Sequence, residues 1–289
     1  MTRDLGLRLA AHVEALAGAI GERHVGRPRA LEEAAAYVER VLGSYGLSVA
    51  SQEFACGPQR VRNLDVEVPG AAGRGPLVVV GAHYDTVPGS PGADDNASGV
   101  AATLEIARMV GQARPGRPVR CVLFVNEEPP WFQTDDMGSR HYARRIKERG
   151  EKVAAMLALE SIGYYVDGPG SQRYPFPLGL AYPDSGNFLA VVSDRRSGGL
   201  LERVVGSFER HSAFPVQGVA VPAWVPGVSW SDQWAFWQEG FPAVMVTDTA
   251  PYRYPAYHTE DDTPDKLRYD ALEAVVAALA AVVVDLATV

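Results

Sequence analysis

The 289-residue chain has little cysteine, fewer basic than acidic residues, and no long apolar run. Two cysteines, Cys56 and Cys121, are too few for a disulfide framework, so we expect isolated thiols of a reducing compartment, although a single bridge stays open. Lys and Arg total 27 against 35 Asp and Glu, and the net charge of −8 argues against nucleic acid or an anionic membrane as main partner. The best apolar run, residues 274–284, is shorter than the roughly 20 residues that cross a bilayer, and no secretory signal is visible. The composition predicts a soluble cytoplasmic protein of unspecified oligomeric state.

Three motifs of common enzyme classes are also missing from the sequence. There is no Gly-x-Ser-x-Gly elbow of a serine hydrolase. There is no His-Glu-x-x-His zinc motif and no Gly-x-x-x-x-Gly-Lys phosphate loop. Any catalytic chemistry must therefore come from side chains that are distant in the sequence.

From about residue 60 onward, short apolar runs alternate with helical segments. Residues 61–68 alternate like a strand, and later runs are typical of strands buried on both faces of a largely parallel sheet: Leu77–Ala82, Cys121–Val125, Ala154–Leu159 and Ala243–Val246. Helices are expected at about 5–16, 29–44, 98–113, 137–149, 232–239 and 269–286. This alternation predicts a single α/β domain, a three-layer sandwich whose central mixed, largely parallel β-sheet is flanked by helices.

Two stretches, residues 163–187 and 212–230, interrupt this alternation. Long irregular segments in compact domains are usually functional, so we expect both to form walls of a site. Several large aromatic residues lie near the second stretch, and they form either part of an apolar side-chain pocket or ordinary core: Trp224, Trp230, Trp234, Phe236 and Trp237.

Groups that bind metals or move protons follow each of the buried runs. His83 and Asp85, the pair Glu127-Glu128, Glu160 and later His258 all come after apolar runs, and the acidic turn Asp94-Asp95 lies between the first two. Ligands in open α/β folds gather beyond the carboxyl ends of the strands. Two histidines with several carboxylates form a hard N/O ligand set that suits zinc, cobalt or manganese. The His83-x-Asp85 spacing also places a carboxylate where it can orient an imidazole.

The order of these motifs resembles that of the dinuclear-zinc aminopeptidase family, which also contains glutamate carboxypeptidase II, glutaminyl cyclases and the transferrin receptor. The resemblance covers roughly residues 30 to 285. It rests on His83-x-Asp85, the run Gly92 to Gly99, Asn126-Glu127-Glu128, Glu160, and Tyr257-His258-Thr259.

The resemblance implies a zinc exopeptidase fold and two Zn²⁺ ions per chain, with Co²⁺ or Mn²⁺ as substitutes. Asp95 would bridge the two ions, and a cis peptide is implied between Asp95 and Asn96. One site would be completed by His83 and Glu160. The other would be completed by Glu128 and His258.

The implied reaction is aminopeptidase hydrolysis of a peptide or amino-acid amide by a hydroxide that both metals share. Glu127 would act as general base, and Asp85 would hold His83 in its ligating tautomer. The acidic site would also hold the free α-ammonium of the substrate. Further substrate contacts are expected from the remaining candidates, Arg253, Trp230, Asp232 and Tyr257.

Some positions depart from the family pattern and affect the expected substrate contacts. Glu160 stands where many relatives have aspartate, and Ser231-Asp232-Gln233 stands where relatives commonly have Ser-Asp-His. The segment 129–139, which follows the glutamate pair, is longer than the corresponding segment that is common in the family. Two alternatives stay open: a glutaminyl cyclase, which works with one zinc, and a non-catalytic binding protein, which is expected to have lost ligands. Zinc stoichiometry separates both from a dinuclear peptidase.

Overall fold

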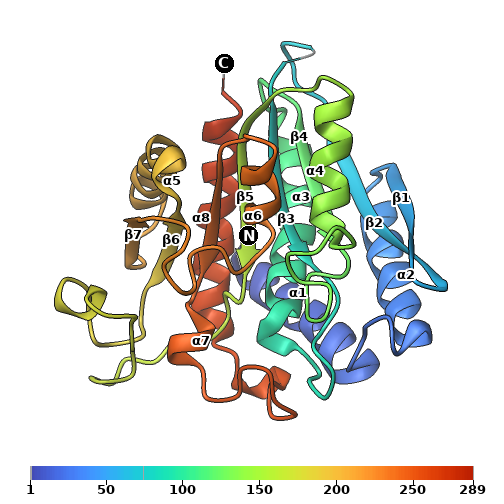
Figure 1. The fold of residues 1–289 in the computed structure, drawn as a ribbon. Helices are drawn as coiled ribbons and strands as arrows, with labels where there is room; N and C mark the ends of the chain where they lie inside the picture. Colours follow the sequence, from blue (N-terminus) through green and yellow to red (C-terminus); the bar gives the residue numbers. More distant parts are fainter. Residues whose placement is uncertain (1, 74, 289) are drawn as a thin grey trace.

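The computed structural model describes residues 2–73 and 75–288, in which eight strands form one sheet (Figure 1). The strands are β1 (Val49–Cys56), β2 (Gln59–Val68), β3 (Leu77–His83), β4 (Val119–Phe124), β5 (Val153–Glu160), β6 (Leu189–Ser193), β7 (Val216–Ala220) and β8 (Ala243–Thr247). The α-helices are α1 (Thr2–Val13), α2 (Pro28–Ser44), α3 (Gly99–Ala113), α4 (Gly138–Glu148), α5 (Gly198–His211), α6 (Gln233–Gln238), α7 (Ala250–Arg253) and α8 (Tyr269–Leu286). A π-helical turn, Glu14–Ile20, continues α1.

The strand order is β1-β2-β4-β3-β5-β8-β6-β7. The central strands β4, β3, β5 and β8 are parallel to one another, and β6 pairs with β7 in parallel. The pairs β1–β2, β2–β4 and β6–β8 are antiparallel. The expected α/β fold with a mixed, largely parallel sheet is therefore confirmed.

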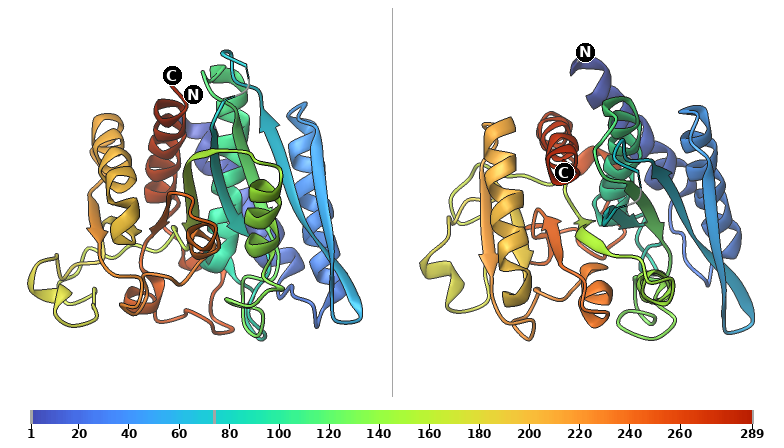
Figure 2. Two further views of the ribbon diagram at one scale, coloured as in Figure 1. Left: turned by 45° about the horizontal axis from the view of Figure 1, so that its top comes forward. Right: turned by 90° about the horizontal axis from the view of Figure 1, so that it is seen from above.

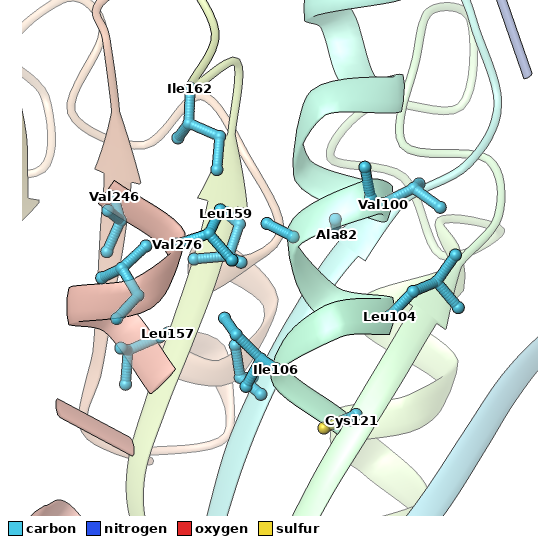
Figure 3. Packing of buried hydrophobic residues seen from close by; sticks show 14 of the residues in the cluster. Ala82, Val100, Leu104, Ile106, Cys121, Leu157, Leu159, Ile162, Val246 and Val276 are labelled. Carbon is cyan, nitrogen blue, oxygen red and sulfur yellow. The ribbon is translucent and has the colours of Figure 1, made fainter. Parts of the chain in front are cut away.

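Helices cover both faces of the sheet, as Figure 2 shows from two further directions. Helices α1, α3, α5 and α8 pack against one another on one face, and α4 packs against α6 on the other. Each face of the sheet has its own apolar core, and successive side chains of β3 point to opposite faces. Val78 and Val80 therefore join the larger core, while Leu77 and Val79 join the smaller one. Figure 3 shows side chains of α3, α8 and the central strands packed together in the larger core. Within the described residues, no helix has both the length and the apolarity needed to cross a membrane.

The sequence analysis missed part of the sheet. Strands β1, β6 and β7 and helix α5 were not expected, and the interpretation of residues 212–230 as a loop is wrong for Val216–Ala220. The residues of β7 are half-buried or exposed because it lies at the edge of the sheet, so it lacks the continuous apolar run of a central strand. The rest of 212–230 and most of 163–187 are irregular.

A buried carboxylate joins the N-terminal helices to α3. Glu105 has no exposed side-chain surface and accepts hydrogen bonds from Arg8 at 3.0 Å, Tyr45 at 2.7 Å and Arg108 at 2.8 Å, with His12 Nε2 at 3.1 Å. Burial by itself raises the pKa of Glu105, but the hydrogen bonds from His12, Tyr45 and Arg108 outweigh burial and lower the pKa to about 2.

We expect Glu105→Gln to lower the free energy of unfolding by about 2 kcal/mol at pH 7, because it removes the buried charge that accepts hydrogen bonds from the partly buried Arg8 and Arg108. A carboxyl whose pKa is depressed on folding stabilises the protein above its unfolded pKa of about 4.5 and loses that effect as the pH falls toward 2. The difference between the variant and the unaltered chain should shrink over this range. Urea unfolding of the metal-free proteins measures it, and a constant difference would contradict the assignment.

Candidate metal centre

Two groups of possible metal-binding side chains that share Asp95 lie at the carboxyl ends of the central strands, and a third group, His83, Glu127 and Glu128, overlaps them. The ligand atoms of His83, Asp95 and Glu160 lie within 4.8 Å of one another, and so do those of Asp95, Glu128 and His258. His83 ends β3, Glu160 ends β5, and Glu128 follows β4, so the sheet order places these three side by side. The five side chains expected as metal ligands are thus gathered in one place.

The two carboxylate oxygens of Asp95 face different histidines. Oδ1 lies 3.2 Å from His83 Nε2, and Oδ2 lies 3.1 Å from His258 Nε2. Asp95 precedes α3, and its peptide bond to Asn96 is cis, as the resemblance implied. The loop turns sharply at Gly92, where φ is +64° and an added Cβ would collide with the Asp95 carbonyl oxygen. This position suits a carboxylate that bridges two cations.

The site fits the metal ions that the family resemblance implies. Four of its atoms are buried and have no hydrogen-bond partner among the described residues: His83 Nε2, Asp95 Oδ1, Glu128 Oε1 and His258 Nε2. Buried polar atoms nearly always have partners, so a group of orphaned nitrogen and oxygen acceptors indicates a bound cation. Imidazole nitrogens and carboxylate oxygens are also the donor atoms that zinc takes.

The crowding of acids raises several pKa values. Burial and the nearby Asp95 raise the pKa of Glu128 to about 7. Burial disfavours charge on His258, but Asp95 and Glu128 outweigh it and raise the pKa of His258 to about 10. Burial likewise disfavours charge on His83, whose pKa is nevertheless well above its ordinary value because of Glu160 and Glu127. Without cations the cluster therefore holds protons, and divalent ions would replace those protons.

The sequence analysis expected Asp85 to hold the His83 ring, but the shortest contacts of its carboxylate are with main-chain N–H groups. His83 Nδ1 lies 3.2 Å from the carbonyl oxygen of Asp85 and 3.6 Å from its carboxylate. A carbonyl only accepts, so Nδ1 carries the proton and Nε2 keeps its lone pair for a cation. The carboxylate of Asp85 accepts the main-chain N–H groups of Glu127 and Glu128, both at 3.2 Å.

Glu127 lies beside the histidine of the first group without belonging to either group that shares Asp95. Its Oε2 is 3.8 Å from His83 Nε2, and its side chain is buried. Burial, together with Glu160 and Glu128, raises the pKa of Glu127 well above its ordinary value, although His83 lowers it. The preceding residue, Asn126, has φ of +59°, so the chain turns sharply as it leaves β4. Glu127 is a carboxyl group placed to exchange a proton next to the metal ligands.

Ser231 is a site residue that the sequence analysis did not select. Its hydroxyl donates to Glu160 Oε2 at 2.7 Å, while Ser161 donates to Oε1 at 3.2 Å. The side-chain amide of Gln233 donates to the Val228 carbonyl, away from the ligands. The Ser-Asp-Gln motif could have indicated Ser231, because the family pattern has serine at the same place.

Asp232 is buried next to the ligands and does not face the cavity. Its side chain is 1% exposed, and both carboxylate oxygens lack hydrogen-bond partners among the described residues. Burial raises the pKa of Asp232 to about 7. Asp232 therefore lies near the candidate ligands His83 and Glu160 rather than in the cavity wall, and a substrate contact by it stays a prediction.

An open apolar cavity adjoins Glu160. Two of the expected substrate residues, Trp230 and Tyr257, line it, and the Tyr257 ring stacks on that of His258 with centroids 3.8 Å apart. Both irregular stretches contribute to the walls. Further lining residues include Tyr174, Leu178, Tyr182, Phe188, Ala190, Val192, Val219, Val228, Met245 and Tyr252.

Most of the aromatic residues considered for this pocket lie elsewhere. Phe236 is fully buried in the smaller core, against which Trp234 and Trp237 pack, and Trp224 is 82% exposed. Of that set, only Trp230 lines the cavity. Tyr174, Tyr182 and Tyr252, which also line it, were not selected from the sequence, because nothing in the sequence marks which face of an irregular segment points inward.

Arg253 is also absent from the cavity lining. It is buried, its Nε donates to Gln172 Oε1 at 2.8 Å, and its guanidinium packs 4.6 Å from the Phe188 ring centroid. These contacts attach the 163–187 segment to α7. The structure therefore places Arg253 in contacts within the protein and outside the cavity lining, and a substrate contact by Arg253 stays a prediction.

Known proteins resemble this chain in sequence over most of its length. The chain is 39% identical over 255 residues to the uncharacterized protein YfbL of Escherichia coli K12, an alignment that covers 85% of this chain and 77% of that protein. It is 25% identical over 244 residues to a probable leucine aminopeptidase of Trichophyton verrucosum, covering 81% of this chain but only 59% of that protein.

Solved structures share the fold. BSAP, a zinc aminopeptidase from Bacillus subtilis, superposes with a TM-score of 0.78 at 15% identity, covering 98% of this chain and 95% of that one. A glutaminyl cyclase from Fimbriiglobus ruber gives 0.69 at 20% identity, covering 96% and 94%. Residues 63–283 match peptidase family M28, which bears out the predicted resemblance. The chain belongs to peptidase family M28.

Proposed function

We propose that this chain is a metal-dependent aminopeptidase that holds two zinc ions and removes apolar residues from the N-terminus of peptides. The observation that carries the proposal is the pair of ligand groups that share the two oxygens of Asp95, with Glu127 beside them. Membership of a peptidase family and the similarity to a probable leucine aminopeptidase support it. All five ligand positions carry competent side chains, which favours a catalytic protein over a binding protein.

The residues of the site divide the chemistry among them. His83, Asp95 and Glu160 would hold one ion, and Asp95, Glu128 and His258 the other. Two such ions, when bound, lower the pKa of water and polarise the scissile carbonyl. Glu127 then takes the proton from the attacking water and delivers it to the leaving amine. The Glu127 side chain is buried, so bulk water does not surround the carboxyl group while it holds the proton between these two steps.

The free α-ammonium of a substrate is attracted by the carboxylates of the site, and the first side chain enters the cavity. The cavity reaches Glu160 and is lined mainly by apolar and aromatic side chains. Burial of such a side chain is favourable in proportion to its apolar area. A bulky apolar first residue therefore fits the site better than a small or charged one. We also propose a cytoplasmic location, since Cys56 and Cys121 are unpaired and buried.

The direct test compares leucyl p-nitroanilide with N-acetyl-leucyl p-nitroanilide, together with the zinc content of the purified chain. We expect two zinc ions per chain, hydrolysis of the free amine only, and loss of hydrolysis on chelation with recovery on adding zinc. One zinc per chain, with cyclisation of N-terminal glutamine and no anilide hydrolysis, would support a glutaminyl cyclase instead.

The cavity makes a specific prediction at Ala190, a nearly buried residue of β6 in its wall. Ala190→Leu adds three carbons to the cavity, so we expect kcat/KM for a phenylalanyl anilide to fall about 10-fold or more, with little change for an alanyl anilide. The matched control is Ala220→Leu, at an exposed position of the neighbouring strand outside the cavity. Equal losses on both substrates would refute the assignment of this cavity to the first side chain.

A further inference from the structure

The short loop from Pro91 to Asp95 carries the bridging carboxylate, and its carbonyl groups are bound by one buried arginine. Arg23 has no exposed surface. Its Nη1 donates to the Pro91 carbonyl at 2.7 Å, and its Nη2 donates to the Gly92 carbonyl at 3.0 Å. Its Nε donates to the carbonyl of Tyr84 at 2.7 Å, between His83 and Asp85. One guanidinium thus binds the main chain of two ligand-bearing segments.

The N–H groups of the same loop are bound from the opposite direction by a buried carboxylate. Asp262 Oδ1 accepts the N–H of Asp94 at 2.8 Å, and Oδ2 accepts the N–H of Asp95 at 3.2 Å. The Asp262 carbonyl accepts the N–H of Ala93 at 3.1 Å, and the Tyr254 hydroxyl donates to Oδ1 at 3.0 Å. Asp262 has no exposed surface. It lies four residues beyond His258, so the loop that carries His258 and the loop that carries Asp95 are joined directly.

The two groups carry opposite charges in the same buried region. Burial lowers the pKa of Arg23 to about 10, which leaves it protonated at neutral pH, and Asp262 is the acid that opposes this shift most. Replacing either group by a neutral one would leave the other as a buried charge with less opposite charge nearby. Arg23 also donates to the carbonyls of Leu16 and Gly21, which fixes the N-terminal helical segment to the same place.

We infer that Arg23 and Asp262 are positioning residues for the metal centre, which hold the Pro91–Asp95 loop from both sides and set the place of the bridging Asp95. This inference rests on the proposed metal binding. Arg23 lies outside residues 63–283, the part that matches the family, so the N-terminal helical segment contributes to the centre as well as to the fold. Neither residue touches the reacting groups; both act through main-chain atoms.

The test measures zinc affinity by competition with a chromophoric chelator in Arg23→Lys and Asp262→Asn, both conservative variants. Partners of this kind that lie behind metal ligands usually change affinity by about 10- to 100-fold, so we expect each variant to bind zinc at least about 10-fold more weakly. Arg27→Lys and Asp261→Asn repeat the same substitutions at exposed neighbours and should leave affinity unchanged. Glu105→Gln, which lowers stability away from the loop, should also leave it unchanged.

Amide hydrogen exchange of the metal-free protein gives a second measurement that needs no bound zinc. In Asp262→Asn the amides of Asp94 and Asp95 should exchange about 10-fold faster or more, while those of α8 keep their rates. The inference is overturned if both variants bind zinc with an affinity within about twofold of that of the unaltered chain. It is also overturned if Glu105→Gln lowers zinc affinity as much as the two variants do. If the unaltered chain binds no zinc, the proposed function fails, and unchanged exchange at Asp94 and Asp95 would separately overturn the positioning role.

Discussion

Glu127→Gln should lower kcat for anilide hydrolysis by about 10²- to 10⁴-fold and leave the zinc content of the chain unchanged. Glutamine has nearly the same shape but cannot take a proton from water at neutral pH. Glu127 shares a third group of possible ligands with His83 and Glu128, but the two ions are assigned to the groups that share Asp95, so we expect its loss to leave both ions bound. Steady-state kinetics with a leucyl anilide and zinc analysis of the same sample measure both effects.

A second substitution at the same position separates proton transfer from simple packing. Glu127→Asp keeps the carboxyl group but moves it by one methylene, so its kcat should lie between those of the glutamine variant and the unaltered chain. If Glu127→Gln kept kcat within about 10-fold, or lost zinc, the assignment of Glu127 as general base would be wrong.

Asp95→Asn should remove both zinc ions and all measurable hydrolysis, because each ligand group depends on one oxygen of Asp95. The amide nitrogen of asparagine cannot bind a cation, and the remaining oxygen carries no full charge. His258→Ala, by contrast, should remove the ion bound with Glu128 and leave the group around His83 and Glu160 intact. Zinc per chain after dialysis against metal-free buffer gives these stoichiometries.

The neighbouring Asp94 provides a matched control for the bridging residue. Asp94 belongs to neither ligand group, and its Oδ1 accepts the N–H of Gly163 at 2.8 Å. Burial and the nearby Asp248 and Asp262 raise the pKa of Asp94 well above its ordinary value, so replacing it by the neutral asparagine costs less than at a carboxyl with an ordinary pKa. Asp94→Asn should therefore retain both ions. A loss of zinc in this variant equal to that in Asp95→Asn would assign the effect to the fold of the loop.

The gathering of the candidate ligands could be predicted from the sequence because the central strands that they follow are buried on both faces. Such strands stand out as apolar runs, and the polar residues that follow β3, β4 and β5 must meet at one edge of the sheet. The pairing of ligands into two groups came from the family resemblance. Strand β1, with the sequence VASQEFAC, was missed because it forms the opposite edge of the sheet, where alternate residues face solvent.

Contacts through main-chain atoms could not be predicted in the same way. Asp85 binds the N–H groups of Glu127 and Glu128, and Arg23 binds only carbonyl groups, so neither contact pairs one distinctive side chain with another. Arg253 shows a second limit: its position near His258 suggested a substrate contact, but its Nε donates to Gln172 and its guanidinium packs on Phe188, outside the cavity lining. Only the folded chain distinguishes an arginine that binds the interior from one that faces a ligand.

The long separation between the two halves of the centre has a consequence for biosynthesis. Domains form from the N-terminus as the ribosome releases the chain, and His83 emerges 175 residues before His258. Until β8 and the segment that follows it are made, the acids after β3, β4 and β5 have neither His258 nor the Asp262 contacts to hold their loop. Under the proposed function, zinc loading would therefore be completed late in maturation, because a nascent chain stalled before β8 would contain four of the five proposed ligands but would lack His258.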